Sequence, residues 1–193
     1  MSKIENAVFR LLDQDHFSDL EREKLRFGIQ IILAESYKII LVYSLAFLLD
    51  CIIPTLLAHL TFFLLRQVCL GYHFDNLWVC LCISIITFPI AIKYIALNYN
   101  SISTTYLYII FAIILILIYT LSPKGTEKQP VINQEHKKYL RKKMTLRVLL
   151  IVGIFCIMPF GMKVFIAYGA FVESIMLIAQ SMKGEFYYEM DHC

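Results

Sequence analysis

The chain has 193 residues, of which 59% are hydrophobic and 17% are charged, whereas soluble domains average roughly 45–50% and 25%. A soluble domain of this length has too little interior to hide so much apolar surface, and the abundance of apolar and aromatic side chains excludes disorder. The formal net charge of +3 is small and gives no indication of a nucleic-acid partner. Composition therefore predicts one compact membrane unit.

Two amphipathic helices are predicted in residues 1–35. Apolar residues recur at i, i+4, i+7 and i+8 from Ile4, with polar residues on the other side, which is the pattern of a short amphipathic helix. Ser18 followed by Glu21 fits a capping box at the start of a second helix. We expect this region to lie on the cytoplasmic leaflet in a structural role.

Six apolar segments follow that approach the length of about 17–25 residues needed to cross a membrane. The predicted spans are 36–53, 54–71, 76–97, 103–121, 145–161 and 163–181. The sequence thus predicts an all-α polytopic membrane protein with about six spans. Its single domain, 1–193, divides into the N-terminal helices of 1–35, four spans in 36–121, a basic loop at 122–144, two spans in 145–181 and a tail at 182–193.

Basic residues are concentrated in two places. Residues 1–38 hold six Lys and Arg, and residues 124–147 hold eight together with two Glu. With six spans both regions fall on one side, and the positive-inside rule assigns that side to the cytoplasm. Both termini are therefore predicted to be cytoplasmic.

The turn between the second and third spans, within 66–82, gathers a His, three Cys, an Asp and a Gly at a membrane boundary. His73 and Cys80 are a candidate base and nucleophile. On one unbroken helix they would be about 10 Å apart along the axis, so the chain must turn between them. If Asp75 or Asn76 caps the next helix, Cys80 lies near its first turn, where the helix dipole and an imidazolium favour a thiolate and backbone N–H groups could hold an oxyanion. The spacing is compatible with acyl transfer by a Cys–His pair.

Two other interpretations of these residues remain open. A Cys–His pair near a membrane boundary is often unrelated to catalysis, since thiols in spans usually behave as small hydrophobes. Cys69, His73, Cys80 and Cys82 could supply four zinc ligands, but C-x-C is not the usual zinc spacing and side chains at i and i+2 of a helix point apart. We expect no metal and no cofactor.

Five ionisable residues lie in or at the ends of apolar runs: Glu35, Asp50, His59, Lys93 and Glu173. Such groups are costly in a membrane and tend to be paired or to face a cavity. Glu173 is near the middle of the last span, so we expect it to pair within the bundle or to line a substrate cavity.

The run from Arg66 to Gly71-Tyr72-His73, with Cys80 seven positions after the His, resembles the signature of the accessory gene regulator protein B (AgrB) family. These are membrane-embedded cysteine peptidases of Gram-positive quorum-sensing systems. A second block, 122–132, followed by a basic helix through Lys143, resembles the loop after the fourth span in that family. The chain departs from the family pattern in having Leu70-Gly71 where two Gly, or Gly with Ala, are frequent, and Arg66-Gln67 where two Arg are frequent.

This resemblance implies a bacterial cell-membrane endopeptidase that removes the C-terminal tail of a precursor signalling peptide. The Cys80 thiolate would attack the peptide carbonyl, with His73 taking and returning protons, and leave an acyl-enzyme thioester. A Cys or Ser of the bound precursor would then displace Cys80 and close a thiolactone or lactone. The implied partners are a precursor with an acidic tail, membrane lipid and a second copy of the chain in a homodimer, without nucleic acid.

Supporting roles are assigned to residues around the pair. Asp75 could orient His73 or cap the helix, and Gly71 and Arg66 could shape the turn. The basic segment could hold its place by binding anionic lipid, or attract the acidic tail through Lys137, Lys138, Lys142 and Lys143. The alternative functions are a small peptide transporter or export channel without covalent catalysis and a structural membrane subunit. A transporter would be expected to show repeated halves, and no convincing repeat is found.

Overall fold

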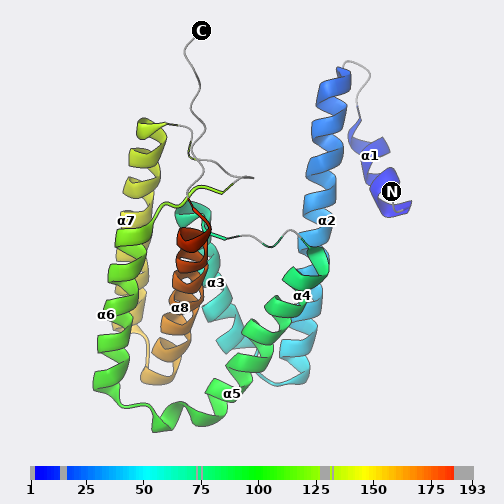
Figure 1. Ribbon diagram of the computed structural model, residues 1–193. Coiled ribbons are helices and arrows are strands. Elements are labelled where there is room, and N and C mark those ends of the chain that lie inside the picture. The colour runs from blue at the N-terminus through cyan, green and yellow to red at the C-terminus, as the bar shows by residue number, and fades with distance from the viewer. Residues whose placement is uncertain are drawn as a thin grey trace.

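The computed structural model describes residues 3–13, 17–72, 74, 76–126, 131 and 133–184. These residues are almost entirely helical and form no named strand (Figure 1). The helices are α1 (Lys3–Leu12), α2 (Asp19–Leu48), α3 (Ile52–Cys69), α4 (Leu77–Ile85), α5 (Ala91–Asn98), α6 (Thr104–Leu121), α7 (Gln134–Ile157) and α8 (Phe160–Lys183). The predicted class, an all-α polytopic membrane protein, is confirmed.

Helix α2 begins at the predicted capping box. The Ser18 hydroxyl oxygen accepts a hydrogen bond from the Glu21 N–H at 3.4 Å, and the Glu21 carboxylate accepts one from the Ser18 N–H at 2.8 Å. The helix then continues to Leu48 without a break. The predicted boundary at residue 35 therefore lies inside one helix, because the polar residues before it are strong helix formers and nothing ends the hydrogen-bond ladder there.

The third span contains a change of helical pitch. α4 and α5 are joined by a π-helical turn, Ile86–Ile90, with Pro89 inside it. Proline has no N–H to donate, so the i to i−4 ladder cannot continue through it unchanged. The Thr87 carbonyl instead accepts a hydrogen bond of 2.8 Å from the Tyr168 hydroxyl, which ties this turn to α8.

Five helices of the described chain are long and apolar enough to cross a membrane: α2, α3, the continuous segment Leu77–Ser101, α6 and α8. The fifth predicted span, 145–161, lies on the second half of α7, whose first half carries the basic residues. After Arg147 only about 15 Å of apolar helix remains, about half of a bilayer core. The second part of the predicted basic loop, from Gln134, thus forms one helix with the span, because Lys and Arg favour helix almost as well as Leu does.

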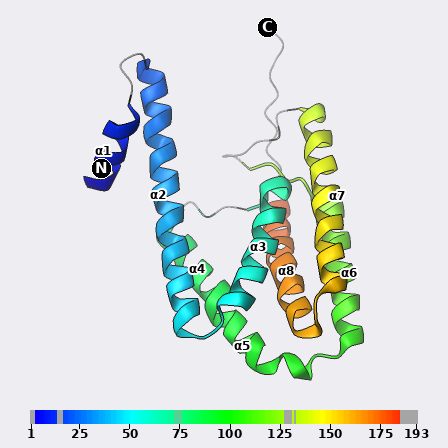
Figure 2. The same ribbon diagram turned by 180° about the vertical axis from the view of Figure 1, so that it is seen from behind.

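α8 occupies the middle of the bundle, between α3 on one side and α6 and α7 on the other (Figures 1 and 2). Its apolar side chains join those of α3, α6 and α7 in the largest core cluster, in which the Phe111 and Phe155 rings stack with centroids 4.0 Å apart. α3 and α8 approach most closely at Gly169, where an added Cβ would lie 2.2 Å from the Ala58 carbonyl oxygen.

α2 stands at the edge of the bundle, far from α6 and α7 (Figure 1). Only Ile29, Val42 and Ala46 of its described side chains are buried, and many of its large apolar side chains are exposed. Exposed apolar side chains on a long helix of this kind suit contact with lipid.

Candidate functional site

Three segments that are far apart in the sequence meet at the end of α3. The Gly71 N–H donates to the Lys124 carbonyl at 3.1 Å, and the Lys124 N–H donates to the Cys69 carbonyl at 3.0 Å. The Tyr72 N–H donates to the Met176 carbonyl of α8 at 3.1 Å. The turn after α3 is therefore bound both to the loop after α6 and to α8, so the two sequence blocks that carry the family resemblance are neighbours in space.

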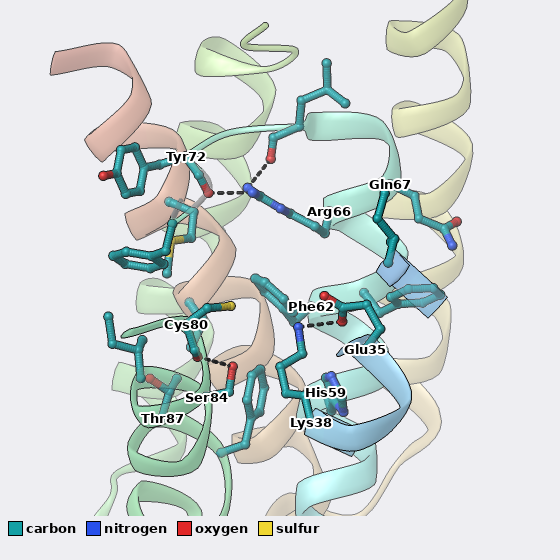
Figure 3. A pocket seen from close by; sticks show the side chains of 18 of the residues that line it. Glu35, Lys38, His59, Phe62, Arg66, Gln67, Tyr72, Cys80, Ser84 and Thr87 are labelled. Carbon is teal, nitrogen blue, oxygen red and sulfur yellow. Dashed lines mark hydrogen bonds and ion pairs between the residues drawn. The ribbon is translucent and has the colours of Figure 1, made fainter. Parts of the chain in front are cut away.

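Arg66 closes this turn from the inside. It lies in the last turn of α3, and its two terminal nitrogens donate to the carbonyls of Leu70 and Tyr72 (Figure 3). Between these carbonyls Gly71 has a φ of +91°, and an added Cβ would lie 2.9 Å from the guanidinium. Glycine is required there both for the left-handed backbone and for the space that Arg66 occupies.

Asn76, one of the two residues predicted to cap this helix, is the N-cap of α4. Its side-chain oxygen accepts hydrogen bonds from the N–H groups of Trp78 at 2.9 Å and Val79 at 3.4 Å. Cys80 follows one turn into the helix, and its own N–H donates to the Asn76 carbonyl at 3.0 Å. In this conformation the Trp78 and Val79 N–H groups are occupied by the cap, so an oxyanion would need other donors.

The predicted base His73 and its neighbour Asp75 lie outside the described residues. The described part of the site is therefore Cys80 and the residues that surround it.

Cys80 lines a cavity of about 680 Å³, a size typical of sites that bind small molecules or short segments. The cavity is bounded by α2, α3, the turn after α3, α4 with its π-helical turn, α7 and α8. Much of its wall is apolar, with Phe62 and Phe63 of α3 facing Ile83 of α4. The Cys80 thiol points toward this space in Figure 3. A peptide segment of mixed character would fit such a wall.

Polar residues of the same cavity were missed, or left without a role, in the sequence interpretation. Lys38 and Glu35 of α2 form an ion pair of 2.5 Å, and His59 of α3 lies beside them with its Nδ1 3.2 Å from the Tyr43 hydroxyl. Glu35 and His59 stood out as ionisable groups in apolar runs, but Lys38 did not, because it follows the polar start of α2. Nothing local in the sequence indicates that these residues face Cys80.

The basic half of α7 begins at the rim of the cavity. His136 and Leu140, one turn apart, are among its lining residues. Of the four predicted substrate-binding lysines, Lys138, Lys142 and Lys143 are exposed and Lys137 is partly buried. They are thus placed beside the cavity and do not line it.

Glu173 is fully buried in α8, and neither of its carboxylate oxygens has a hydrogen-bond partner in the described part of the chain. Glu173 is not among the residues lining the cavity, although Val172 and Met176 of the same helix are.

The described residues contain no group of three or more His, Cys, Asp or Glu side chains that could hold a metal ion. Of the four residues weighed as zinc ligands, His73 lies outside this description, Cys69 is fully buried and Cys82 is exposed.

Comparison of the sequence with those of known proteins shows the family to which the chain belongs. The family model described as Accessory gene regulator B matches residues 4–178. The chain is 30% identical over 175 residues to the accessory gene regulator protein B of Staphylococcus intermedius, covering 91% of this chain and 92% of that protein. It is 33% identical over 179 residues to the protein of the same name from Staphylococcus aureus (strain JH9), covering 92% and 93%. A putative AgrB-like protein of Listeria monocytogenes serotype 4a (strain HCC23) is 31% identical over 170 residues, covering 86% and 82%. No solved structure matches the chain.

Proposed function

We propose that this chain, which belongs to the accessory gene regulator B family, is a membrane cysteine endopeptidase. It removes the C-terminal tail of a precursor signalling peptide and promotes closure of the remainder to a thiolactone or lactone for quorum sensing. The observation that supports this most is the position of Cys80, one turn into a capped helix with its thiol in a cavity of about 680 Å³.

The chemistry proceeds in two acyl transfers. The Cys80 thiolate attacks the carbonyl carbon at the end of the future ring, the C–N bond breaks, and the tail leaves as an amine with a proton supplied by His73. A thiol or hydroxyl within the bound precursor then gives its proton to His73 and attacks the thioester, which releases the Cys80 thiolate and the ring. The second step exchanges the acyl-enzyme thioester for the thioester of a thiolactone or the ester of a lactone and needs no ATP.

Arg66 supplies a fixed positive charge to this site. Arg66 and Cys80 both line the cavity. Because its donors are held by the Leu70 and Tyr72 carbonyls, the charge does not have to reorganise when negative charge develops on the substrate carbonyl oxygen.

The test is tail release from a co-expressed precursor, with the products identified by mass spectrometry. Cys80→Ala and His73→Ala should each abolish release, and the wild-type chain should carry a thioester at Cys80. Cys82→Ala is the matched control, since that thiol is two residues away, is exposed and does not line the cavity. Tail release by Cys80→Ala would contradict the nucleophile assignment.

The assignment of His73 as the base is tested against the two described histidines at the cavity. His59 and His136 both line the cavity, so at saturating precursor His59→Ala and His136→Ala should still form the thioester if His73 is the base. Loss of the thioester in either variant, with retention in His73→Ala, would transfer the role to that residue.

We further propose that the basic half of α7 attracts an acidic precursor tail. Neutralising Lys137, Lys138, Lys142 and Lys143 together should raise KM and leave kcat unchanged, because the side chains lie beside the cavity and not at Cys80. An unchanged KM with normal membrane insertion would assign these lysines to topology alone.

The proposed orientation has both termini in the cytoplasm. The polar start of α2 and the basic start of α7 lie at the same end of the bundle (Figure 1), and the positive-inside rule assigns such an end to the cytoplasm. The proposed homodimer has a direct measurement, the mass of the detergent-purified protein.

A further inference from the structure

Across the cavity from Cys80 lies a polar wall formed by Lys38, Glu35 and His59, here called the α2–α3 wall. Figure 3 shows the three side chains on the α2 and α3 side, facing the helix that carries Cys80. All three, and Cys80, are lining residues of the one cavity. A substrate held with its scissile carbonyl at Cys80 therefore lies between the nucleophile and this wall.

The α2–α3 wall lies well inside the lengths of α2 and α3, away from the helix ends. Lys38 precedes the end of α2 at Leu48 by about 15 Å of helix, and His59 follows the start of α3 at Ile52 by about 10 Å. The hydrocarbon core of a bilayer is about 30 Å thick, so both residues lie at membrane depth. Ionisable side chains at that depth are costly, and they mark binding sites or ion pathways far more often than they mark packing.

The charges around the cavity favour an anion. Its described lining holds two side chains with permanent positive charge, Lys38 and Arg66, two imidazoles, and one carboxylate, that of Glu35. The Arg66 donors are already bound to backbone carbonyls. Lys38 is ion-paired with Glu35, but an ammonium has three donors and can bind a second carboxylate. Lys38 is thus the cation with donors to offer a ligand.

Glu35 and His59 are suited to assist. The Glu35 side chain is 48% exposed, whereas that of Lys38 is 17% exposed, so Lys38 is the inner partner of the pair and Glu35 the outer one. His59 is held by Tyr43 and by contact with the Phe88 ring, whose centroid is 4.7 Å from its own. Its imidazole is therefore fixed in place next to the ammonium.

We propose that Lys38, with His59 beside it, is a binding site for a carboxylate side chain of the peptide substrate, held across the cavity from Cys80. This inference rests on the proposed function for the identity of the ligand as a peptide. It makes the α2–α3 wall a determinant of which precursor is accepted, separate from the lysines of α7.

The experiment measures how the wall affects a small carboxylate delivered to Cys80. The full-length wild-type chain in detergent is treated with 2-carboxyethyl or 2-aminoethyl methanethiosulfonate. In each case the thiolate attacks the sulfenyl sulfur, a disulfide forms and methanesulfinate leaves. Mass spectrometry of the Cys80 peptide gives each rate, which is divided by the rate of the same reagent with free cysteine. We expect the normalised ratio to favour the carboxylate reagent by at least about tenfold, as for one charge-assisted hydrogen bond.

Variants of the wall should change that ratio in opposite directions. Lys38→Met should lower it at least fivefold, Lys38→Glu should reverse it, and Glu35→Gln should raise it. Lys38→Arg keeps the charge and should keep the ratio, which shows that a change at this position does not itself unfold the site. Lys163→Met is the matched control, because Lys163 donates to the Tyr108 hydroxyl and lies at the start of α8, away from the part of this helix that lines the cavity.

A wild-type ratio near one, or an unchanged ratio in Lys38→Met, would overturn the proposal. So would an equal fall in Lys163→Met, because the effect would then come from total charge. These rates need no peptide cleavage. If the wild-type chain shows the expected ratios but releases no tail from any precursor, the peptidase assignment fails and the carboxylate site stands.

Discussion

Replacing Arg66 by lysine tests whether the guanidinium holds the turn that precedes the nucleophile. Arg66 donates to two carbonyls at once, those of Leu70 and Tyr72. A lysine ammonium is a single compact charge that does not reproduce the planar fork of a guanidinium. Arg66→Lys should therefore keep the positive charge and lose at least one charge-assisted hydrogen bond.

The size of the effect follows from that loss. A hydrogen bond to a charged group contributes about 1.5–3 kcal/mol, and 1.36 kcal/mol corresponds to a factor of ten. Opening of the turn should become about 10- to 150-fold more frequent. The Gly71 and Lys124 N–H groups, which pair the turn with the loop after α6, should then exchange with deuterium faster by that factor.

Hydrogen–deuterium exchange on the detergent-purified protein measures this directly. Amides in the middle of α6, which contact none of these groups, serve as the internal control and should not change. Thioester formation at Cys80 should fall in the same range as the exchange rises. If the segments 69–72 and 122–126 of Arg66→Lys exchange at the same rate as in the wild-type chain, the reasoning is refuted. Faster exchange throughout the chain would show general unfolding instead.

Three further substitutions test the packing and the caps. Gly169→Ala should lower the free energy of unfolding by about 1–3 kcal/mol through overpacking against α3, and Gly153→Ala, where an added Cβ meets nothing within 4 Å, should not; thermal unfolding in detergent distinguishes them. Asn76→Ala should destabilise the start of α4 by about 0.5–2 kcal/mol and slow thioester formation. Asn76→Asp should keep the wild-type stability and the wild-type rate. A normal rate of thioester formation in Asn76→Ala would contradict a role for the cap. Gln180→Leu should speed hydrogen exchange of the backbone N–H groups in 122–126. The substitution removes the side-chain NH₂ group that donates to the carbonyls of Gly125 and Gly184. Unchanged exchange would refute this.

The features predicted correctly from sequence are those that depend on neighbours in the chain. The capping box at Ser18, the cap at Asn76 and the position of Cys80 one turn later each require only a few adjacent residues. Apolar runs of sufficient length likewise indicate helices wherever they occur. The fold class follows from these local signals.

The ends of helices relative to the membrane could not be predicted in the same way. A hydropathy pattern shows where the apolar part of a helix stops, but the hydrogen-bond ladder continues through Lys, Glu and Arg. This is why α2 includes the polar residues from Asp19 and why α7 begins at Gln134. In both helices the polar part extends the apolar part without a loop.

The parts of the site that were missed depend on contacts between distant segments. The α2–α3 wall needs α2 to face α4 across a cavity, and the pairing of Gly71 with Lys124 joins residues that α4, α5 and α6 separate in the chain. Neither arrangement has a signature within one helix. Single-sequence patterns therefore singled out Cys80 as a candidate nucleophile and did not indicate the surface opposite to it.

The pairing of Gly71 with Lys124 also bears on the two roles considered for the basic segment. It fixes the first residues of that segment to the turn preceding Cys80, and His136 and Leu140 bring α7 to the rim of the same cavity. If lysines hold this helix at a membrane surface, they also hold it beside the cavity that Cys80 lines. Topology and the proposed attraction of an acidic tail are therefore compatible roles for one set of charges. The two contributions separate by salt: attraction of a tail in solution weakens as the Debye length falls, so KM should rise with ionic strength in the wild-type chain and not in the chain with the four lysines neutralised.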